Sequence, residues 1–172
     1  SVGPFSNIAA LHAVDPEALS LAKRVVSMAG RFFPEPGHEW NCIVDPVATA
    51  IVAEAQIPGH LWVGLDVTME CVMEREEVKR KFTDPLLAVV LEMAEAWFEK
   101  RPEITFHDPL AAALLFKPQL CRLSHGMVEA SLPDTHGRGG VTSLLPDEGP
   151  HCAATEVDAS AFFQEFFSVF SG

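Results

Sequence analysis

A chain of 172 residues is long enough to bury the hydrophobic core of one domain. Its composition, 48% hydrophobic and 21% charged, excludes an intrinsically disordered protein. The net charge of -12 argues against a nucleic-acid partner because phosphate binding needs clustered Lys and Arg, and no apolar run is long enough to cross a membrane. The four cysteines lack zinc-binding spacing, so we expect free buried thiols and a cytoplasmic protein.

Apolar periodicity and turn residues predict helices and strands in alternation. The expected elements in chain order are a helix over 7–13, a helix that starts at 16, a strand over 24–30, a loop over 31–40, a helix over 46–56, a strand over 59–68, helices over 74–82, 84–100 and 109–116, strands over 121–133, 137–146 and 152–158, and a helix over 159–170. This order is typical of an α/β fold, so we expect a mostly parallel sheet with helices on both faces and the late strands as a small antiparallel appendage.

Helix starts carry a recurring signature. Asp followed by Pro precedes four of the expected helices, at 15–16, 45–46, 84–85 and 108–109. An Asp side chain accepts hydrogen bonds from the free N–H groups of a first helical turn, and Pro suits the first helical position. Ser6 or Asn7 is expected to cap the first helix in the same way. In the strand over 59–68, the alternating apolar residues are Leu61, Val63, Leu65 and Val67.

Two pairs of polar residues are candidates for chemistry. Asp108 fits the capping pattern, which favours a structural role, but His107 directly before it places an imidazole at the mouth of the sheet, where acid–base chemistry is common. Glu39 and Asn41 lie two residues apart. In an extended segment both side chains would point to one face, and a carboxylate beside an amide suits a polyol such as a sugar. The alternative is a solvated loop glutamate and a turn asparagine.

The C-terminal part of the inosine–uridine-preferring nucleoside hydrolases resembles this chain in ordered segments, which are VGPFSNIA, RVVSMAG, EWNCIVDPVATAIV, GLDVT, FHDPLAAALL, VEA followed by GRGGVTSL, and a closing VD. The resemblance covers nearly the whole chain. It implies a Rossmann-like α/β fold in which residues 1–172 form a single domain without the family's first strands. It also implies hydrolysis of the N-glycosidic bond of ribonucleosides, with a role in purine salvage, and a tightly bound Ca²⁺ ion.

The resemblance implies roles for individual side chains. Glu39 and Asn41 are similar to the family's ligands of the ribose hydroxyls, and Met28 is similar to a residue that lines the ribose pocket. His107 resembles the histidine that helps the base depart, by protonation or hydrogen bonding. Residues 31–33 stand where the family commonly has an asparagine that contacts the ribose 5′-hydroxyl, so the preferred substrate stays open.

The calcium site that the resemblance implies is incomplete. Asp108 resembles a carboxylate ligand of the ion, and the backbone carbonyl of Val2 stands where the family supplies a carbonyl ligand. The family's aspartate cluster, DxDxxxDD, provides the general base and most of the ligands, yet this chain has no DD dipeptide. Because Ca²⁺ takes about six to eight oxygen ligands, we expect this chain to bind it weakly or not at all.

Two functions follow from this resemblance. The chain is either part of a nucleoside hydrolase, inactive alone, with a ribonucleoside as its ligand, or a catalytically dead relative that acts as a binding or interaction module. A sheet without its first strands would expose an edge and apolar helix faces, so we also expect self-association into a homo-oligomer.

Overall fold

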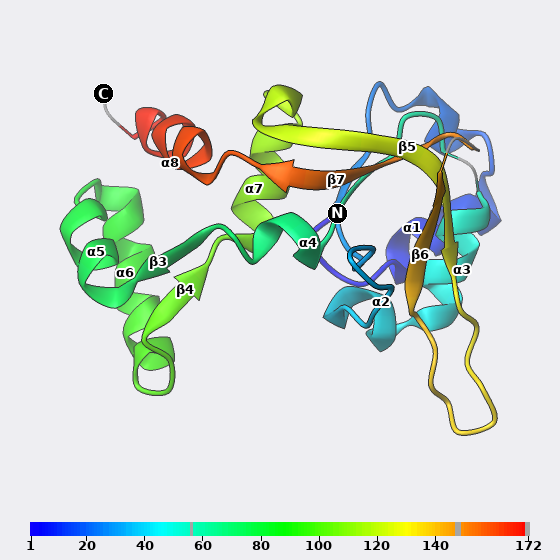
Figure 1. Cartoon of the computed structure of the whole chain (residues 1–172), viewed down its shortest axis with the longest axis horizontal. Coiled ribbons are helices and arrows are strands. Elements are labelled where there is room, and N and C mark those ends of the chain that lie inside the picture. Colours follow the sequence, from blue (N-terminus) through cyan, green and yellow to red (C-terminus); the bar gives the residue numbers. More distant parts are fainter. Residues whose placement is uncertain (56, 147–148, 171–172) are drawn as a thin grey trace.

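The computed structural model describes residues 1–55, 57–146 and 149–170, and Figure 1 shows its helices arranged around a central sheet. Within these residues, five strands form the main sheet in the order β1-β2-β7-β5-β6, and two form a separate sheet. The strands are β1 (Val26–Met28), β2 (Leu61–Val63), β3 (Val72–Glu74), β4 (Glu103–Thr105), β5 (Cys121–Ala130), β6 (Thr142–Pro146) and β7 (His151–Val157). The helices are α1 (Ser6–Val14), α2 (Trp40–Val44), α3 (Pro46–Glu54), α4 (Leu65–Thr68), α5 (Arg75–Lys81), α6 (Pro85–Phe98), α7 (His107–Leu114) and α8 (Ala159–Ser168), with 3₁₀ turns at Ala18–Leu21 and Pro118–Leu120.

The main sheet combines parallel and antiparallel pairs. Strands β1, β2 and β7 pair in parallel, whereas β7, β5 and β6 pair antiparallel. The α/β class and a small antiparallel sheet are confirmed, but that small sheet is β3–β4, and the late strands belong to the main sheet. Three-residue strands such as β3 and β4 show too little alternation to be found by periodicity. Figure 1 shows them with α5 and α6 at one end of the molecule, away from β6.

Side chains on opposite faces of the sheet enter two separate hydrophobic clusters. Leu61 and Val63 belong to the cluster that α5, α6, α7 and α8 cover, and Trp62 between them belongs to the cluster that α1 and α3 cover. This follows from the alternation of side chains along a strand. Helices on both faces of the sheet are therefore confirmed. The α8 phenylalanines belong to the core, since Phe162 is fully buried and its neighbours pack on the same cluster.

Two of the four Asp-Pro aspartates cap helices as expected, and Asp158 supplies a further aspartate cap. Oδ1 of Asp45 accepts from the Ala48 N–H at 3.0 Å, and Asp84 and Asp158 cap α6 and α8 in the same way. The charged helix predicted over 74–82 is α5, where Lys81 pairs with Glu77. Gln56, the last residue of the helix expected over 46–56, lies outside the described residues.

Two predictions at the start of the chain are wrong. Phe5 is the N-cap of α1 and no side chain caps that helix, because the Ser6 hydroxyl donates to Asp45 Oδ2 at 2.6 Å instead. The Asp-Pro pair at 15–16 precedes only the 3₁₀ turn at Ala18–Leu21. A longer helix would include the β-branched residues that lead into β1.

The strand predicted over 59–68 is also wrong beyond Val63. Gly64 ends it, because its α-carbon lies so close to Gly30 that an added Cβ would come within 2.7 Å of the Gly30 carbonyl oxygen. That oxygen accepts from the Leu65 N–H at 2.9 Å, and α4 begins there. The apolar residues that mimic strand alternation, Leu65 and Val67, thus contribute to the core from a helical turn.

The cysteines match the expectation from the sequence. All four thiols are buried and form no disulfide. Burial raises the pKa of Cys71 and of Cys121 to about 12, so both stay protonated at neutral pH. Across the described part of the chain, no helix combines the length and the apolar character that spanning a membrane requires.

Candidate functional site

A cavity of about 400 Å³ lies at the carboxyl ends of β1 and β2. Met28 ends β1 and Leu65 follows β2, and both line the cavity. Ligands of α/β sheets bind at this edge, and the volume lies within the usual range for small-molecule sites. The structure brings together in this one cavity every residue that the sequence singled out for a site, namely Val2, Met28, Glu39, Asn41, His107 and Asp108.

Glu39 reaches the cavity as the N-cap of α2. Its Oε1 accepts from the Asn41 N–H at 2.8 Å, and its Oε2 accepts from the N–H groups of Cys42 and Gly30 at 3.1 and 3.3 Å. The carboxylate is buried, and three backbone donors compensate for its lost hydration. The alternative of a solvated loop glutamate is therefore wrong.

Asn41 belongs to α2, so the expectation of an extended segment with Glu39 is wrong although both side chains line the same cavity. Its Nδ2 donates to the Met28 carbonyl oxygen at 3.0 Å. This bond orients the amide and leaves Oδ1 as an acceptor toward a ligand. The start of α2 thus directs both side chains to one cavity, as an extended segment was expected to do.

His107 is the first residue of α7, and Phe106 is its N-cap. The helix predicted to begin at Pro109 thus starts two residues earlier, and Asp108 lies in its first turn without acting as the cap. The His107 Nδ1 lies 2.8 Å from the hydroxyl of Thr68. Burial lowers the pKa of His107, and the carboxylates of Asp108 and Glu39 oppose that shift, so the imidazole is neutral at physiological pH.

Val2 borders the cavity beside β1. The Ser1 amino group donates to the Val26 carbonyl oxygen at 2.7 Å, and the Ser1 carbonyl accepts from the Met28 N–H at 2.9 Å. Burial lowers the pKa of the Ser1 amino group, and Asp108 opposes that shift, which places Asp108 within electrostatic range of this segment.

The donors at this site do not fit a calcium ion. Asp108 and the carbonyl of Val2 line the cavity, but both Glu39 oxygens already accept backbone N–H groups. Among the described residues, no group of three or more His, Cys, Asp or Glu side chains is placed to hold a metal ion. Six to eight oxygen ligands cannot be assembled from this set of protein groups.

A family model described as "Inosine-uridine preferring nucleoside hydrolase" matches residues 1–164. The chain belongs to this family. The pyrimidine-specific ribonucleoside hydrolase RihA of Salmonella paratyphi B is 32% identical over 133 residues, which cover 70% of this chain and 42% of that relative. The RihA of Shewanella woodyi is 31% identical over 149 residues, covering 80% of this chain and 47% of the relative. The chain thus spans less than half the length of these curated nucleoside hydrolases.

Solved nucleoside hydrolases share the fold. A purine-preferring ribonucleoside hydrolase from Gardnerella vaginalis has a TM-score of 0.81 at 24% identity, covering 99% of this chain and 60% of its own. An inosine-guanosine nucleoside hydrolase has a TM-score of 0.83 at 17% identity, covering 98% of this chain and 60% of its own. At these identities the similarity concerns the fold, and it confirms the nucleoside hydrolase architecture expected from the sequence.

Some residues of the nucleoside hydrolase cavity were missed in the sequence. The cavity-lining residues without an expected role are His38, Trp40, Leu65, Thr105 and Pro109. Behind the lining, the hydroxyl of Thr68 contacts His107, and no role was expected for Thr68 beyond its place in the segment GLDVT. The position of Thr68 at the carboxyl end of a strand–helix junction is the signal that could have found it.

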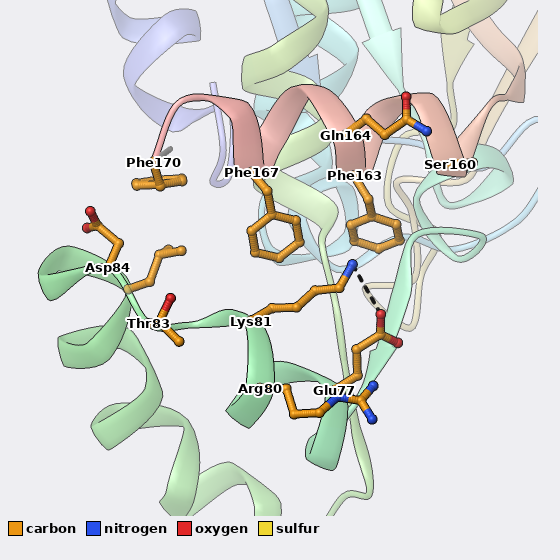
Figure 2. Close-up of a pocket in the computed structure, with 11 residues that line it drawn as sticks. Glu77, Arg80, Lys81, Thr83, Asp84, Ser160, Phe163, Gln164, Phe167 and Phe170 are labelled. Atoms are coloured by element: carbon orange, nitrogen blue, oxygen red, sulfur yellow. Dashed lines mark ion pairs between the residues drawn. The ribbon is translucent and has the colours of Figure 1, made fainter. Parts of the chain in front are cut away.

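A wider groove of about 720 Å³ lies outside the nucleoside hydrolase cavity, between α8 and the α5–α6 junction. Figure 2 shows Phe163 and Phe167 of α8, and Phe170 just beyond its end, facing this groove. The Lys81 ammonium lies 4.9 Å from the Phe167 ring centre and pairs with Glu77 at 3.2 Å. No residue that the sequence singled out for a site lines this groove. Its larger volume alone does not make it the candidate site.

Proposed function

We propose that this protein supplies the ribose-facing and base-facing part of a ribonucleoside hydrolase site, and that residues 1–172 alone bind a ribonucleoside without hydrolysing it. One observation carries the proposal: segments from five regions of the sequence meet in one cavity of about 400 Å³ at the carboxyl edge of the sheet. Membership of the nucleoside hydrolase family supports the reaction class.

The contacts support a role for each side chain. Asn41 has its amide nitrogen bound to Met28, so its oxygen accepts from a ribose hydroxyl. Glu39 retains lone pairs for a second hydroxyl beside its three backbone donors. Met28 contributes an apolar wall against the sugar. His107 donates a hydrogen bond or a proton to the departing base.

In the whole reaction the N-glycosidic bond breaks, the oxygen of water bonds to the anomeric carbon of ribose, and the base leaves with a proton. Activation of that water needs a general base, and we assign this role to no described residue. Catalysis in this family's manner therefore needs carboxylates beyond the described set, and so does firm Ca²⁺ binding. The free buried cysteines favour a cytoplasmic location, where the released base can enter purine salvage.

The test combines binding with turnover. Uridine and inosine are titrated into the ¹⁵N-labelled chain, and we expect backbone shifts concentrated at Asn41, Glu39 and His107. Chromatography of the same mixtures, with and without CaCl₂, is expected to detect no free base. Absence of shifts at millimolar nucleoside would overturn the binding proposal, and robust base release would overturn the claim that the chain is inactive alone. Gln119→Ala changes an exposed side chain, so it serves as the control variant and is expected to bind nucleoside as the wild type does.

A binding or interaction module without catalysis is the second candidate. The observation that favours it is the Glu39 carboxylate, whose hydrogen bonds to the N–H groups of Asn41 and Cys42 are explained by the capping of α2 alone. The coding sequence directly upstream of the Ser1 codon separates the candidates. A reading frame encoding DxDxxxDD there supports the hydrolase, and a start codon immediately before the Ser1 codon supports the module.

A further inference from the structure

The hydroxyl of Thr68 and the imidazole of His107 form a partly buried contact between α4 and α7. The Thr68 Oγ1 lies 2.8 Å from His107 Nδ1, and Thr68 is fully buried. Backbone bonds hold the two elements in the same relation, because the Phe106 N–H donates to the Cys71 carbonyl oxygen at 2.8 Å and the Cys71 N–H donates to the Thr68 carbonyl oxygen at 3.1 Å. The contact therefore joins two fixed points and does not depend on a mobile side chain.

The burial of Thr68 decides the direction of this hydrogen bond. Among the described residues, Oγ1 makes no other hydrogen bond. If Nδ1 carried the proton and donated to Oγ1, the threonine O–H would be left buried without an acceptor, which is unfavourable. Donation from the O–H to Nδ1 satisfies both groups. The proton of the neutral imidazole is then on Nε2.

We propose that Thr68 is a positioning residue that fixes His107 as the Nε2–H tautomer and aims that N–H into the cavity. This inference rests on the proposed function for its meaning, because an N–H donor at this point faces the base of a bound nucleoside. The opposite tautomer would present a lone pair instead, which suits a base and not a donor. Thr68 thus acts through His107 and need not touch the ligand.

Neighbouring contacts of α4 explain how Thr68 stays in place. The Thr68 N–H donates to the Gly64 carbonyl oxygen at 3.2 Å. Asp66, in the same short helix, accepts from the N–H groups of Phe32 and Phe33 at 3.0 and 2.6 Å. One helical turn therefore orients His107 with one side chain and anchors the loop after β1 with another.

The test reads the tautomer directly and needs no catalytic activity. Ring ¹⁵N shifts are recorded near pH 8, where histidine is neutral, and the His107 signal is assigned with a His107→Gln variant. We expect the wild-type ring to be protonated on Nε2. Thr68→Val, which keeps the shape but removes the hydroxyl, is expected to give a mixture of tautomers, and Thr68→Ser is expected to restore the wild-type pattern.

Nucleoside binding provides the second measurement. Loss of the ordered donor in Thr68→Val is expected to weaken uridine binding about two- to tenfold, with recovery in Thr68→Ser. An Nδ1–H tautomer in the wild type, or unchanged ring shifts in Thr68→Val, overturns the inference without requiring that any variant bind ligand. If the tautomers behave as expected and no protein binds nucleoside, the proposed function fails and the positioning role stands.

Discussion

The side-chain amide of Asn41 donates to the backbone carbonyl oxygen of Met28 at 3.0 Å, which fastens α2 to the carboxyl end of β1. Asn41→Ala removes the donor and leaves a buried carbonyl without this partner, so we expect the free energy of unfolding to fall by about 1–3 kcal/mol. Urea denaturation measures the loss. Gln119→Ala changes an exposed side chain and is expected to stay within about 0.5 kcal/mol of the wild type.

The contact between Asn41 and Met28 also shows how much of this site could be predicted from the sequence. Residue chemistry selected Asn41, Glu39 and His107, the resemblance to a family added Met28, and the structure places all four around one cavity. Glu39 and Asn41 were expected to lie in one extended segment. This was wrong, because a spacing of two residues cannot distinguish a strand from a capped helix start. The contact of Thr68 with His107 was missed, since it joins residues 39 positions apart and only the place of Thr68 after a strand hinted at a site.

Local signals predicted the fold unevenly for similar reasons. Asp45 and Asp84 cap helices as expected because a cap depends on the three or four residues that follow it. The end of β2 depends instead on the approach of Gly64 to Gly30, which is a tertiary contact. The alternation of apolar residues continues past Gly64, so the sequence predicted a strand where the chain turns into α4.

Gly64 is expected to tolerate no side chain. In Gly64→Ala, the new Cβ would meet the Gly30 carbonyl oxygen at 2.7 Å, and Gly30 itself has a φ of 93° that restricts its relaxation. We expect a loss of about 1–3 kcal/mol in the free energy of unfolding, together with weaker nucleoside binding, since β1 and β2 both end at the cavity. Gly3→Ala is the control because nothing lies within 4 Å of its added Cβ. Equal effects of the two substitutions would contradict the argument.

Acid is expected to destabilise the protein through His60. This side chain is buried against Trp62, with Nε2 2.8 Å from the Ser27 hydroxyl, and burial together with the nearby His151 lowers its pKa to about 3. In the unfolded chain the pKa is about 6.5, so the unfolded state binds a proton that the native state does not. The stabilisation from this group is complete above about pH 6.5 and is lost as the pH falls toward 3, by up to about 1.4 kcal/mol per pH unit.

Urea unfolding at a series of pH values measures that slope. His60→Phe keeps an aromatic ring in the cluster but removes the titrating group, so the slope below about pH 6.5 is expected to become shallower even if the variant is less stable. His136→Gln, at an exposed position, is expected to leave the slope unchanged. A wild-type slope that persists in His60→Phe would assign the acid sensitivity to other groups.

One face of α6 is expected to mediate self-association. The opposite face, with Leu87 and Phe98, packs into the core, but an apolar stripe at spacings of three and four residues is exposed, formed by Leu86, Val89, Val90, Met93 and Trp97. An apolar helix face of this kind favours pairing with a second copy. We expect concentration-dependent association in sedimentation velocity at micromolar concentration. The double substitution Leu86→Lys and Met93→Lys should reduce it, because it places charges in the stripe, whereas Glu92→Lys, off the stripe, should not. A wild-type protein that stays monomeric over this range would remove the reason to regard α6 as an interface.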